Sequence, residues 1–247
     1  MLKFNHATLS HAGGRKFNED AANNWLISNT QGCWVMADGL GGHGGGDVAA
    51  DMAANSIIEA YKNNPEFSAG QLDTLLAMAH QAILQGQQQN DRVSAMRSTA
   101  VVLMLQGKQA LWAHIGDSRL YYFSHGLIVQ QTKDHSVPQV MVDAGHIRAD
   151  AIRHHEDRNR LTRSLGNPGK LRTTVLEQAI EVHPGDAFLL CTDGFWEFVT
   201  ESDMQATLAN ASAPVDWLAA MERILQSRAP DSHDNYTATA LFLEPQP

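Results

Sequence analysis

The acidic residues best placed to do chemistry in this chain of 247 residues lie where predicted strands begin or end. Carboxylates at the ends of buried strands can converge on one edge of a sheet, where they would repel one another and shift their own pKa values. A divalent cation between them removes that cost. The positions are Glu19 and Asp20 before a strand, Asp38 and Asp193 at strand ends and each followed by glycine, Asp117 after another strand, and Asp234 before the last one.

The donor type selects the metal, because carboxylate, carbonyl and water oxygens suit Mg²⁺ or Mn²⁺ rather than zinc. The chain has 12 histidines, but no His-x-x-x-His pair falls on a convincing helix, and the adjacent His154 and His155 would point apart. Each aspartate alone has a second interpretation, since Asp-Gly is a common turn signal and Asp often caps an element. The metal hypothesis therefore rests on the whole set.

A glycine-rich segment follows the first Asp-Gly pair. Residues 38–46 read DGLGGHGGG, with six glycines in nine residues. Such a run costs backbone entropy and is accepted where the backbone must approach a ligand closely or adopt positive φ. It contains neither a Gly-Lys-Ser/Thr phosphate loop nor a dinucleotide-binding pattern. We expect the aspartate of this segment to bind a metal ion, with the backbone carbonyl of the next glycine as a second ligand. A helix is expected to begin near Gly45, and its N-terminus favours anionic groups nearby.

Hydrophobic periodicity predicts the elements that must position these groups. Strands are expected in blocks separated by pairs of helices, which favours antiparallel sheets with helices on their outer faces, an α+β sandwich. A polar loop is expected at Gln85–Asn90, and a hairpin turn at His125-Gly126. The expected strands are 24–30, 32–37, 99–105, 110–115, 120–124, 127–131, 174–180, 187–192 and 237–243, and the expected helices follow the glycines through Tyr61, then span 72–83, 137–144, 201–209 and 215–227.

Composition excludes several classes of protein. The hydrophobic fraction of 43% and the charged fraction of 18% are those of a globular chain. With 27 acidic and 18 basic residues the net charge is −9, which argues against nucleic-acid binding. No apolar run approaches a membrane span, and residues 1–10 lack a signal core, so a cytoplasmic location is expected. Cys33 and Cys191 are expected to be buried, reduced thiols, and residues 1–247 to form a single domain and a monomer.

Eight short motifs run over nearly the whole chain. They are Arg15-Lys16-Phe17-Asn18-Glu19-Asp20, Val35-Met36-Ala37-Asp38-Gly39 with the glycines to Gly46, Ser98-Thr99-Ala100, Gly116-Asp117-Ser118-Arg119, Thr132-Lys133-Asp134-His135-Ser136, Leu161-Thr162-Arg163-Ser164-Leu165-Gly166, Cys191-Thr192-Asp193-Gly194 and Asp234-Asn235-Tyr236-Thr237-Ala238. In this order they resemble the metal-dependent protein serine/threonine phosphatases of type 2C, in their short bacterial form. The ordered set is far more specific than any one of the motifs.

The resemblance implies a β-sandwich of two antiparallel sheets flanked on both sides by helices, a four-layer αββα arrangement. It also implies two Mn²⁺ or Mg²⁺ ions at one edge, with a third, weaker ion. Asp38 would bridge the two ions and the Gly39 carbonyl would bind one of them. The remaining ligands would be Asp193 and Asp234 on the other ion, Asp20 in preference to Glu19 directly or through water, and Asp117 with Asp193 at the third site.

The implied reaction is hydrolysis of phosphoserine and phosphothreonine in proteins that a serine/threonine kinase has phosphorylated. Two cations bridged by Asp38 would lie ~3.5–4 Å apart and lower the pKa of a shared water toward ~7 for attack on phosphorus. Arg15 would bind phosphate, since a guanidinium fork pairs with two oxygens at once and lysine does not. Neither cysteine has the Cys-x₅-Arg arrangement of a nucleophile, so neither receives a catalytic role.

Two positions depart from the eukaryotic pattern of this family. A histidine that could act as general acid follows the Asp-Gly pair there, whereas Leu40 follows it here and the nearest histidine is His43. Whether His43, another group or a metal-bound water protonates the leaving oxygen stays open. Glu197 stands after Trp196 where many relatives carry Asp, which puts the share of this position in the third metal site in doubt.

A substrate-side flap is expected at about 145–172. It concentrates positive charge in an acidic protein, which would steer anionic phosphopeptides toward the site. Two other functions remain open: a relative that binds phosphopeptides or a kinase without catalysis, and a hydrolase of small phosphate esters. The positively charged residues of the flap are Arg148, Arg153, Arg158, Arg160, Arg163, Lys170 and Arg172, and its negatively charged residues are Asp150, Glu156 and Asp157.

Overall fold

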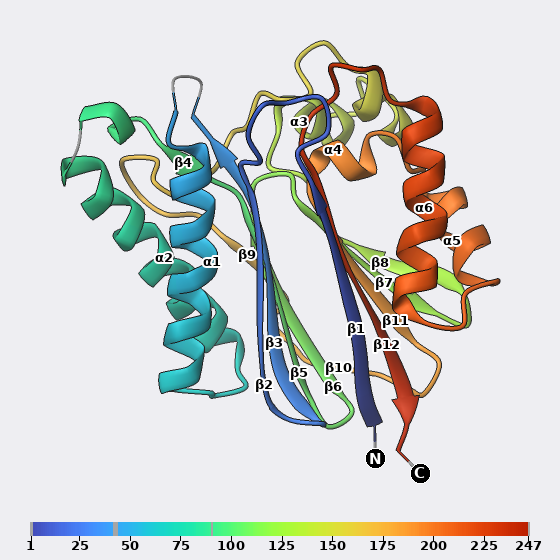
Figure 1. Ribbon diagram of the computed structural model, residues 1–247. Helices are drawn as coiled ribbons and strands as arrows, with labels where there is room; N and C mark the ends of the chain where they lie inside the picture. The colour runs from blue at the N-terminus through green and yellow to red at the C-terminus, as the bar shows by residue number, and fades with distance from the viewer. Residues whose placement is uncertain (1, 42–43, 90, 247) are drawn as a thin grey trace.

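Two antiparallel sheets pack face to face, and helices cover the outer face of each (Figure 1). The computed structural model describes residues 2–41, 44–89 and 91–246. The two ends of the chain lie side by side, because Leu2 pairs with Pro245. The expected four-layer αββα arrangement is confirmed.

The first sheet has the strand order β1-β12-β11-β7-β8. Its two longest strands, from the two ends of the chain, pair along their whole length. The strands are β1 (Leu2–His11), β7 (Arg119–Ser124), β8 (Leu127–Gln131), β11 (Ala187–Cys191) and β12 (Tyr236–Pro245).

The second sheet has the order β10-β6-β5-β3-β2, with β4 paired to β3 and β9 paired to β6. All of its pairs are antiparallel. The strands are β2 (Asp20–Ser28), β3 (Gln31–Leu40), β4 (Arg97–Ser98), β5 (Ala100–Gln106), β6 (Gln109–Ile115), β9 (Thr174–Val175) and β10 (Ile180–Glu181).

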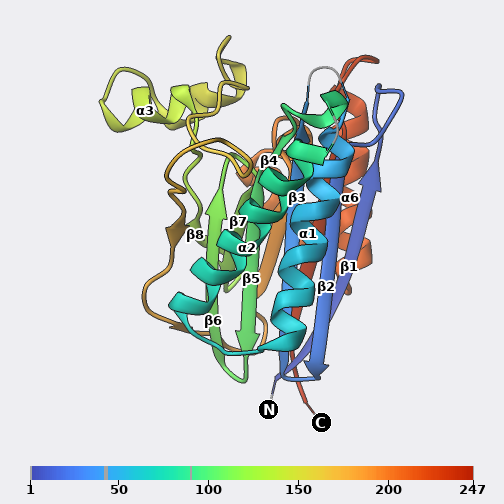
Figure 2. The same ribbon diagram turned by 90° about the vertical axis from the view of Figure 1, so that its left-hand side faces the viewer.

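Two long helices cover the second sheet and two shorter ones cover the first (Figure 1). Between them, α3 and the segment after it project beyond the end of the sheets (Figure 2). The helices are α1 (Gly46–Asn63), α2 (Ala69–Gln89), α3 (Val137–Asp143), α4 (Asp193–Trp196), α5 (Glu201–Leu208) and α6 (Pro214–Arg228), with 3₁₀ turns at Asp91–Val93 and Ala149–His154.

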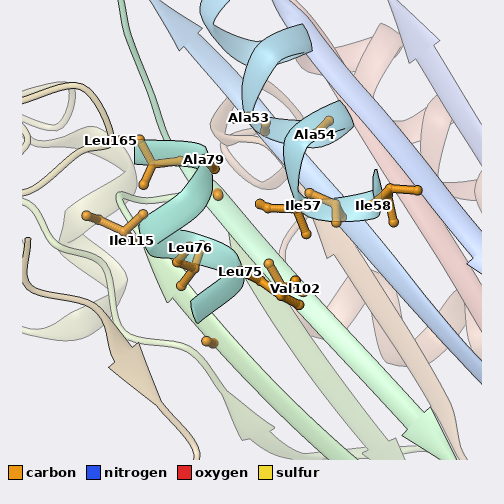
Figure 3. Close-up of a cluster of buried hydrophobic side chains, with 14 of the residues drawn as sticks. Ala53, Ala54, Ile57, Ile58, Leu75, Leu76, Ala79, Val102, Ile115 and Leu165 are labelled. Atoms are coloured by element: carbon orange, nitrogen blue, oxygen red, sulfur yellow. The ribbon is translucent and has the colours of Figure 1, made fainter. Parts of the chain in front are cut away.

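The alternation of side chains along each strand builds three buried layers. In β3, Cys33 and Val35 face α1 and α2, whereas Trp34 and Met36 face the other sheet. Figure 3 shows how residues of α1 and α2 interlock over β5 in the first of these layers. Leu165, which lies in the second half of the flap, is fully buried in the same layer, so the flap is anchored there.

The single strand expected at 174–180 is wrong. Two short strands, β9 and β10, take its place, and both pair with β6. Val175 lies opposite Ala113 and Ile180 opposite Ala110, so the four residues between them face only two residues of β6. The excess length interrupts the strand, as in a bulge.

The polar loop expected at 85–90 is also wrong over its described part, because α2 continues to Gln89. Glutamine is a good helix former, and polarity alone does not end a helix. Gln87 also donates from its side chain to the carbonyl oxygens of Met96 and Gly166, at 2.7 and 2.8 Å. Asn90 lies outside the described residues.

The hairpin turn expected at His125-Gly126 is confirmed. The turn between β7 and β8 has positive φ at both His125 (52°) and Gly126 (78°), as the two-residue hairpin requires. The segment 145–170 has no strand or α-helix, but it contains the 3₁₀ turn at 149–154. Within the described part of the chain, none of the helices combines the length and the apolar character needed to cross a bilayer.

Candidate functional site

Two of the predicted ligands stand directly opposite each other in the second sheet. The register of β2 and β3 pairs Asp20 with Asp38. The predicted bounds of both strands are wrong at this end, because β2 spans Asp20–Ser28 instead of 24–30 and β3 spans Gln31–Leu40 instead of 32–37. Like charges at directly opposite positions destabilise an antiparallel pair. Such a pair is expected only where a positive charge, such as a bound cation, offsets the repulsion between the two carboxylates.

The other three aspartates reach the same edge from the first sheet. Asp193 lies two residues after the end of β11, and Asp234 and Asp117 each lie two residues before the start of β12 and β7. Because β11 runs antiparallel to both β7 and β12, its end lies beside their beginnings. Antiparallel topology thus turns positions scattered over more than 200 residues into one cluster, as predicted.

Neighbouring hydroxyl groups fix the backbone of Asp38. The Thr99 hydroxyl accepts from the Asp38 amide at 2.9 Å, and the Thr99 amide donates to the Asp38 carbonyl at 2.9 Å. The Ser98 hydroxyl donates to the same carbonyl at 3.0 Å. Ser118, which follows Asp117, is hydrogen-bonded to Thr99 at 2.7 Å, so two of the acidic segments share one anchor.

Both Asp-Gly glycines are needed for close backbone approach rather than for a turn. A Cβ on Gly39 would collide with the backbone of Gly46 at the start of α1, and a Cβ on Gly194 would collide with the carbonyl oxygen of Asn235. Gly39 lies within β3, and Gly194 within α4. The turn interpretation of the two Asp-Gly pairs is therefore wrong.

The electrostatics of the cluster are those of a site without its counter-charge. Burial raises the pKa of Asp38 well above its usual range, and Asp193, Asp20 and Asp117 raise it further. Burial also raises the pKa of Asp20, to about 7, despite hydrogen bonds from Thr237 and Thr192 that oppose the shift. The carboxyl groups of Asp38 and Asp193 are hydrogen-bonded to each other. A bound cation would lower these pKa values and allow the carboxyl groups to ionise together near neutral pH.

An open cavity of about 700 Å³ lies over this edge. Glu19 lines the cavity, whereas Asp20 is not among its lining residues and its carboxylate accepts from the Thr192 hydroxyl at 2.9 Å. The flap contributes Asn159 and Leu161. The predicted site residues that line the cavity are Arg15, Asp38, Gly39, Asp117, Asp193 and Asp234.

Arg15 reaches the cavity from the loop between β1 and β2. Its guanidinium forms a two-pronged pair with the Asp234 carboxylate, with nitrogen–oxygen distances of 3.1 and 3.0 Å. Among the described residues, this is the only ion pair that any of the five aspartates makes. The side chain is exposed and its fork has the geometry that two phosphate oxygens need.

Asn235 holds that loop, a role that the sequence analysis missed. Its side-chain amide donates to the carbonyl oxygens of Ala12 and Phe17, and its side-chain oxygen accepts from the Glu19 amide. The residue is buried, so these bonds lie away from water. The position of Asn235 directly beside Asp234, a predicted ligand, is the sequence signal that indicates this role.

A separate network of buried side chains lies next to Asp117. Arg119 makes two hydrogen bonds to Asp134, at 2.8 and 2.7 Å, and stacks over Trp196 at 3.5 Å. The indole nitrogen of Trp196 in turn donates to the carbonyl oxygen of Asp117 at 2.9 Å. This network therefore fixes the backbone of a predicted ligand.

Glu197 lies at the border of the cluster. Its carboxylate pairs with Arg158 of the flap at 2.9 Å. Burial raises the pKa of Glu197, although Arg158 opposes the shift. The longer side chain thus connects the flap to the acidic edge. His43, the other departure noted above, lies outside the described residues.

The residues fit a hard divalent ion. The donors are carboxylate and carbonyl oxygens, and the cluster carries more negative charge than Arg15 balances. Among the described residues, no group of three or more His, Cys, Asp and Glu side chains is arranged to hold a metal ion by itself. An ion here would depend on shared carboxylates, a backbone carbonyl and water, which is how Mg²⁺ is usually held.

The flap is less basic than its composition predicts. Arg153 is buried and pairs with Glu201 at 2.6 Å, so it is part of the core rather than of the surface. Arg148 pairs with Asp150, and Arg160 pairs with Asp157. Local carboxylates therefore neutralise much of the charge that was expected to steer the substrate.

Comparisons with known proteins agree with this geometry. The family model of protein phosphatase 2C matches residues 9–234. The serine/threonine phosphatase stp of Listeria monocytogenes is 30% identical over 200 residues, which make up 78% of each chain. PppA of Pseudomonas aeruginosa has 29% identity and a TM-score of 0.77, with 98% of both chains covered.

The fold also matches the catalytic domain of PstP solved in complex with two manganese ions, at 24% identity and a TM-score of 0.83, over 99% of this chain and 100% of that one. The motifs, the convergence of the aspartates and the family match over almost the whole chain lead to one conclusion. The chain belongs to the protein phosphatase 2C family, the metal-dependent serine/threonine protein phosphatases.

Proposed function

We propose that this protein hydrolyses phosphoserine and phosphothreonine in phosphorylated proteins with a water that two divalent ions activate. The observation that supports this most is the uncompensated carboxylate cluster, which faces a cavity that also holds an arginine fork. Bound ions would supply the activated water and withdraw charge from the phosphoryl oxygens. The chain's own residues bind the ions, orient the phosphate and exclude other groups from the cavity.

The proposed ligand set follows the geometry of the edge. Asp38 would bridge the two ions, the Gly39 carbonyl would complete one site, and Asp193 and Asp234 would hold the other. Asp38 and Asp193 already share a hydrogen bond, and Gly39 is held against the start of α1. Asp20, with Glu19 beside it, supports the first site directly or through water, and Asp117 with Asp193 forms a third, weaker site.

Arg15 is the proposed phosphate ligand. It borders the cavity and already holds two oxygens of a carboxylate with one guanidinium. A phosphate monoester presents two oxygens with similar spacing, so the same fork can orient it for in-line attack. Lysine at this position offers only a point charge and is expected to orient the phosphate less well.

Manganese and magnesium both suit the donors, and the two manganese ions bound to the PstP domain favour manganese as the first metal to test. The proposed partners are phosphorylated proteins, acted on by a monomer of one catalytic domain spanning 1–247. The free, buried thiols of Cys33 and Cys191 suit a reducing compartment, so we propose a cytoplasmic location.

The decisive experiment measures phosphate release from a threonine-phosphorylated protein with Mn²⁺ and with a chelator, in the wild type and in Asp38→Asn. We expect at least a ~10³-fold loss in the variant and in the chelator, because the ions supply the activated water. Asp51→Asn, an exposed position on α1, is the matched control and should retain activity. Equal activity without metal would contradict the proposal.

The same assay separates the alternatives left open above. A hydrolase of small esters would prefer free phosphoserine or a nucleotide to the phosphoprotein. A non-catalytic binding protein would bind the phosphoprotein and release no phosphate with any divalent ion. The retained aspartates argue against the second alternative, since loss of a bridging carboxylate is the simplest route to it.

A further inference from the structure

A second pocket, of about 430 Å³, lies next to the candidate active site. We call it the basic pocket, defined by Arg163, Lys170 and Arg172 with the polar side chains of Thr162, Ser164 and Asn167. No acidic residue lines it. In a chain with a net charge of −9, a cavity with three cations and no carboxylate is unusual.

The three cations differ from the others of the flap. Arg148, Arg153, Arg158 and Arg160 each lie within ion-pair distance of a carboxylate. No described carboxylate lies within that distance of Arg163, Lys170 or Arg172. Cations that gather without a counter-charge repel one another, and an anion between them removes the cost.

The wall of the basic pocket is fixed rather than loose. Leu165 forms a β-bridge with Ser98 and is buried in the core. The Thr162 amide donates to the His135 carbonyl at 2.8 Å, and Arg163 Nη1 lies 3.2 Å from His135 Nε2. The segment 162–165 is therefore held at both ends, and Arg163 is oriented before any ligand binds.

One stretch of chain separates the basic pocket from the catalytic cavity. Leu161 lines the cavity and Arg163 lines the basic pocket, two residues further along. On the other side, Asp117 lines the cavity and Ile115 lines the pocket. Two residues of extended backbone span about 7 Å, so one short peptide can reach both places.

We propose that the basic pocket binds a second phosphate group on the substrate protein, two to five residues from the phosphoserine or phosphothreonine in the catalytic cavity. The proposal rests on the proposed function and gives it a substrate class, which is proteins phosphorylated at neighbouring positions. The chemistry of recognition is that of a phosphate dianion, which accepts charge-assisted hydrogen bonds from Arg163 and Arg172 and pairs with Lys170. A free phosphate compound offers the same chemistry, and the experiment must separate the two sources.

The test compares KM for threonine-phosphorylated peptides that carry phosphoserine, glutamate or alanine at two to five residues on either side. We expect the best doubly phosphorylated peptide to have a KM roughly tenfold below that of its alanine counterpart, with glutamate between them. In Lys170→Gln/Arg172→Gln the ratio of the two KM values should fall toward one. The preference should weaken with salt, because the cations are exposed or half-buried.

Arg148→Gln is the matched control, since it removes one positive charge from the same flap at a residue that is already paired and lies outside the pocket. It should keep the wild-type ratio. A wild type without preference for any doubly phosphorylated peptide, or a double variant that keeps the preference, would overturn the proposal.

A second arm tests the other source. Pyrophosphate is added to assays with the alanine peptide, in the wild type and in the double variant. A pyrophosphate effect that the double variant loses, with no preference among peptides, would assign the pocket to a free anion and overturn the substrate proposal. Hydrolysis of an aryl phosphate with Mn²⁺ is followed in parallel, because its absence in the wild type would mean that the proposed function itself has failed.

Discussion

Two groups of buried charges lie side by side at the end of the sandwich, and they are built in opposite ways. The Arg119 network is closed, because the buried side chains of Arg119 and Asp134 pair with each other and Arg153 pairs with Glu201. The acidic edge is open, because four of its five aspartates have no ion pair among the described residues. Asp117 and Arg119, two residues apart in sequence, belong to different groups.

The pKa shifts express the same contrast. Burial by itself would raise the pKa of Glu201, but Arg153 and Arg119 beside it lower the pKa overall. Burial raises the pKa of Asp38, and its carboxylate neighbours raise it further. The charges of the Arg119 network are balanced within the chain, whereas those of the acidic edge need a bound ligand to balance them. A buried imbalance of this kind marks the site more reliably than the presence of buried charge.

The largest expected effect distinguishes the two groups by stability. Asp134→Asn leaves Arg119 buried without its main partner and should lower the free energy of unfolding by ~3–5 kcal/mol. Asp38→Asn removes a repelling carboxyl group and should leave the stability of the metal-free protein unchanged or raised, although activity is lost. Urea unfolding in the presence of a chelator measures both variants. A larger loss of stability in Asp38→Asn than in Asp134→Asn would reverse the comparison.

Metal binding at the acidic edge should stabilise the folded protein. At a free Mn²⁺ concentration one hundred times Kd, the wild type should gain ~2.7 kcal/mol of stability, seen as a higher Tm in thermal unfolding. Asp38→Asn should gain much less, because a shared ligand is missing. Asp134→Asn, although less stable, should show the full metal-dependent gain. If all three proteins respond alike, Mn²⁺ binds elsewhere.

A third buried group should respond to acid. His114 and His135 stack at 4.6 Å between ring centres, burial lowers the pKa of both, and for His135 the value falls to about 3. A depressed folded-state pKa gives stability that is present above the unfolded value of 6.5 and is lost as the pH falls below it. His135 should cost about 2 kcal/mol of stability at pH 5 relative to pH 7.5, and His114 should add to that loss in the same direction.

Urea unfolding of the wild type and His135→Gln at the two pH values checks this expectation. The variant lacks the contribution of His135, so its stability should fall by about 2 kcal/mol less than that of the wild type between pH 7.5 and pH 5. An unchanged pH dependence would mean that His135 is not held neutral in the folded protein.

The smallest expected effect concerns the loop that carries Arg15. Asn235→Ala removes three hydrogen bonds from the Ala12–Glu19 loop and should raise KM for a phosphoprotein several-fold, because Arg15 is then less well positioned. The Mn²⁺-dependent rise in Tm should stay close to that of the wild type. A raised KM together with a smaller Mn²⁺-dependent rise in Tm would indicate that Asn235 supports the metal site instead.

Local patterns in the sequence were enough to predict most elements and the chemistry of the site. Period-two and helical repeats predicted most strands and helices and the layered arrangement, but not β1. The Asp-Gly pairs marked the acidic edge of the sandwich, although β3 continues past the first pair to Leu40. They failed where a neighbouring element decides the outcome. The segment 174–180 has more residues than the part of β6 that it faces, so it forms two short strands instead of one. The helix α2 continues through a polar run in which the side chain of Gln87 is hydrogen-bonded to the backbone of Met96.

What the sequence determined by itself was the type of the side chains at the acidic edge, since side-chain chemistry is local. Only the tertiary structure decided which charges are balanced. Register places Asp20 opposite Asp38, and chain crossings place Asp134 against Arg119 and leave Arg163, Lys170 and Arg172 without a carboxylate. Electrostatic energy depends on distance and on burial, and neither is written along the chain.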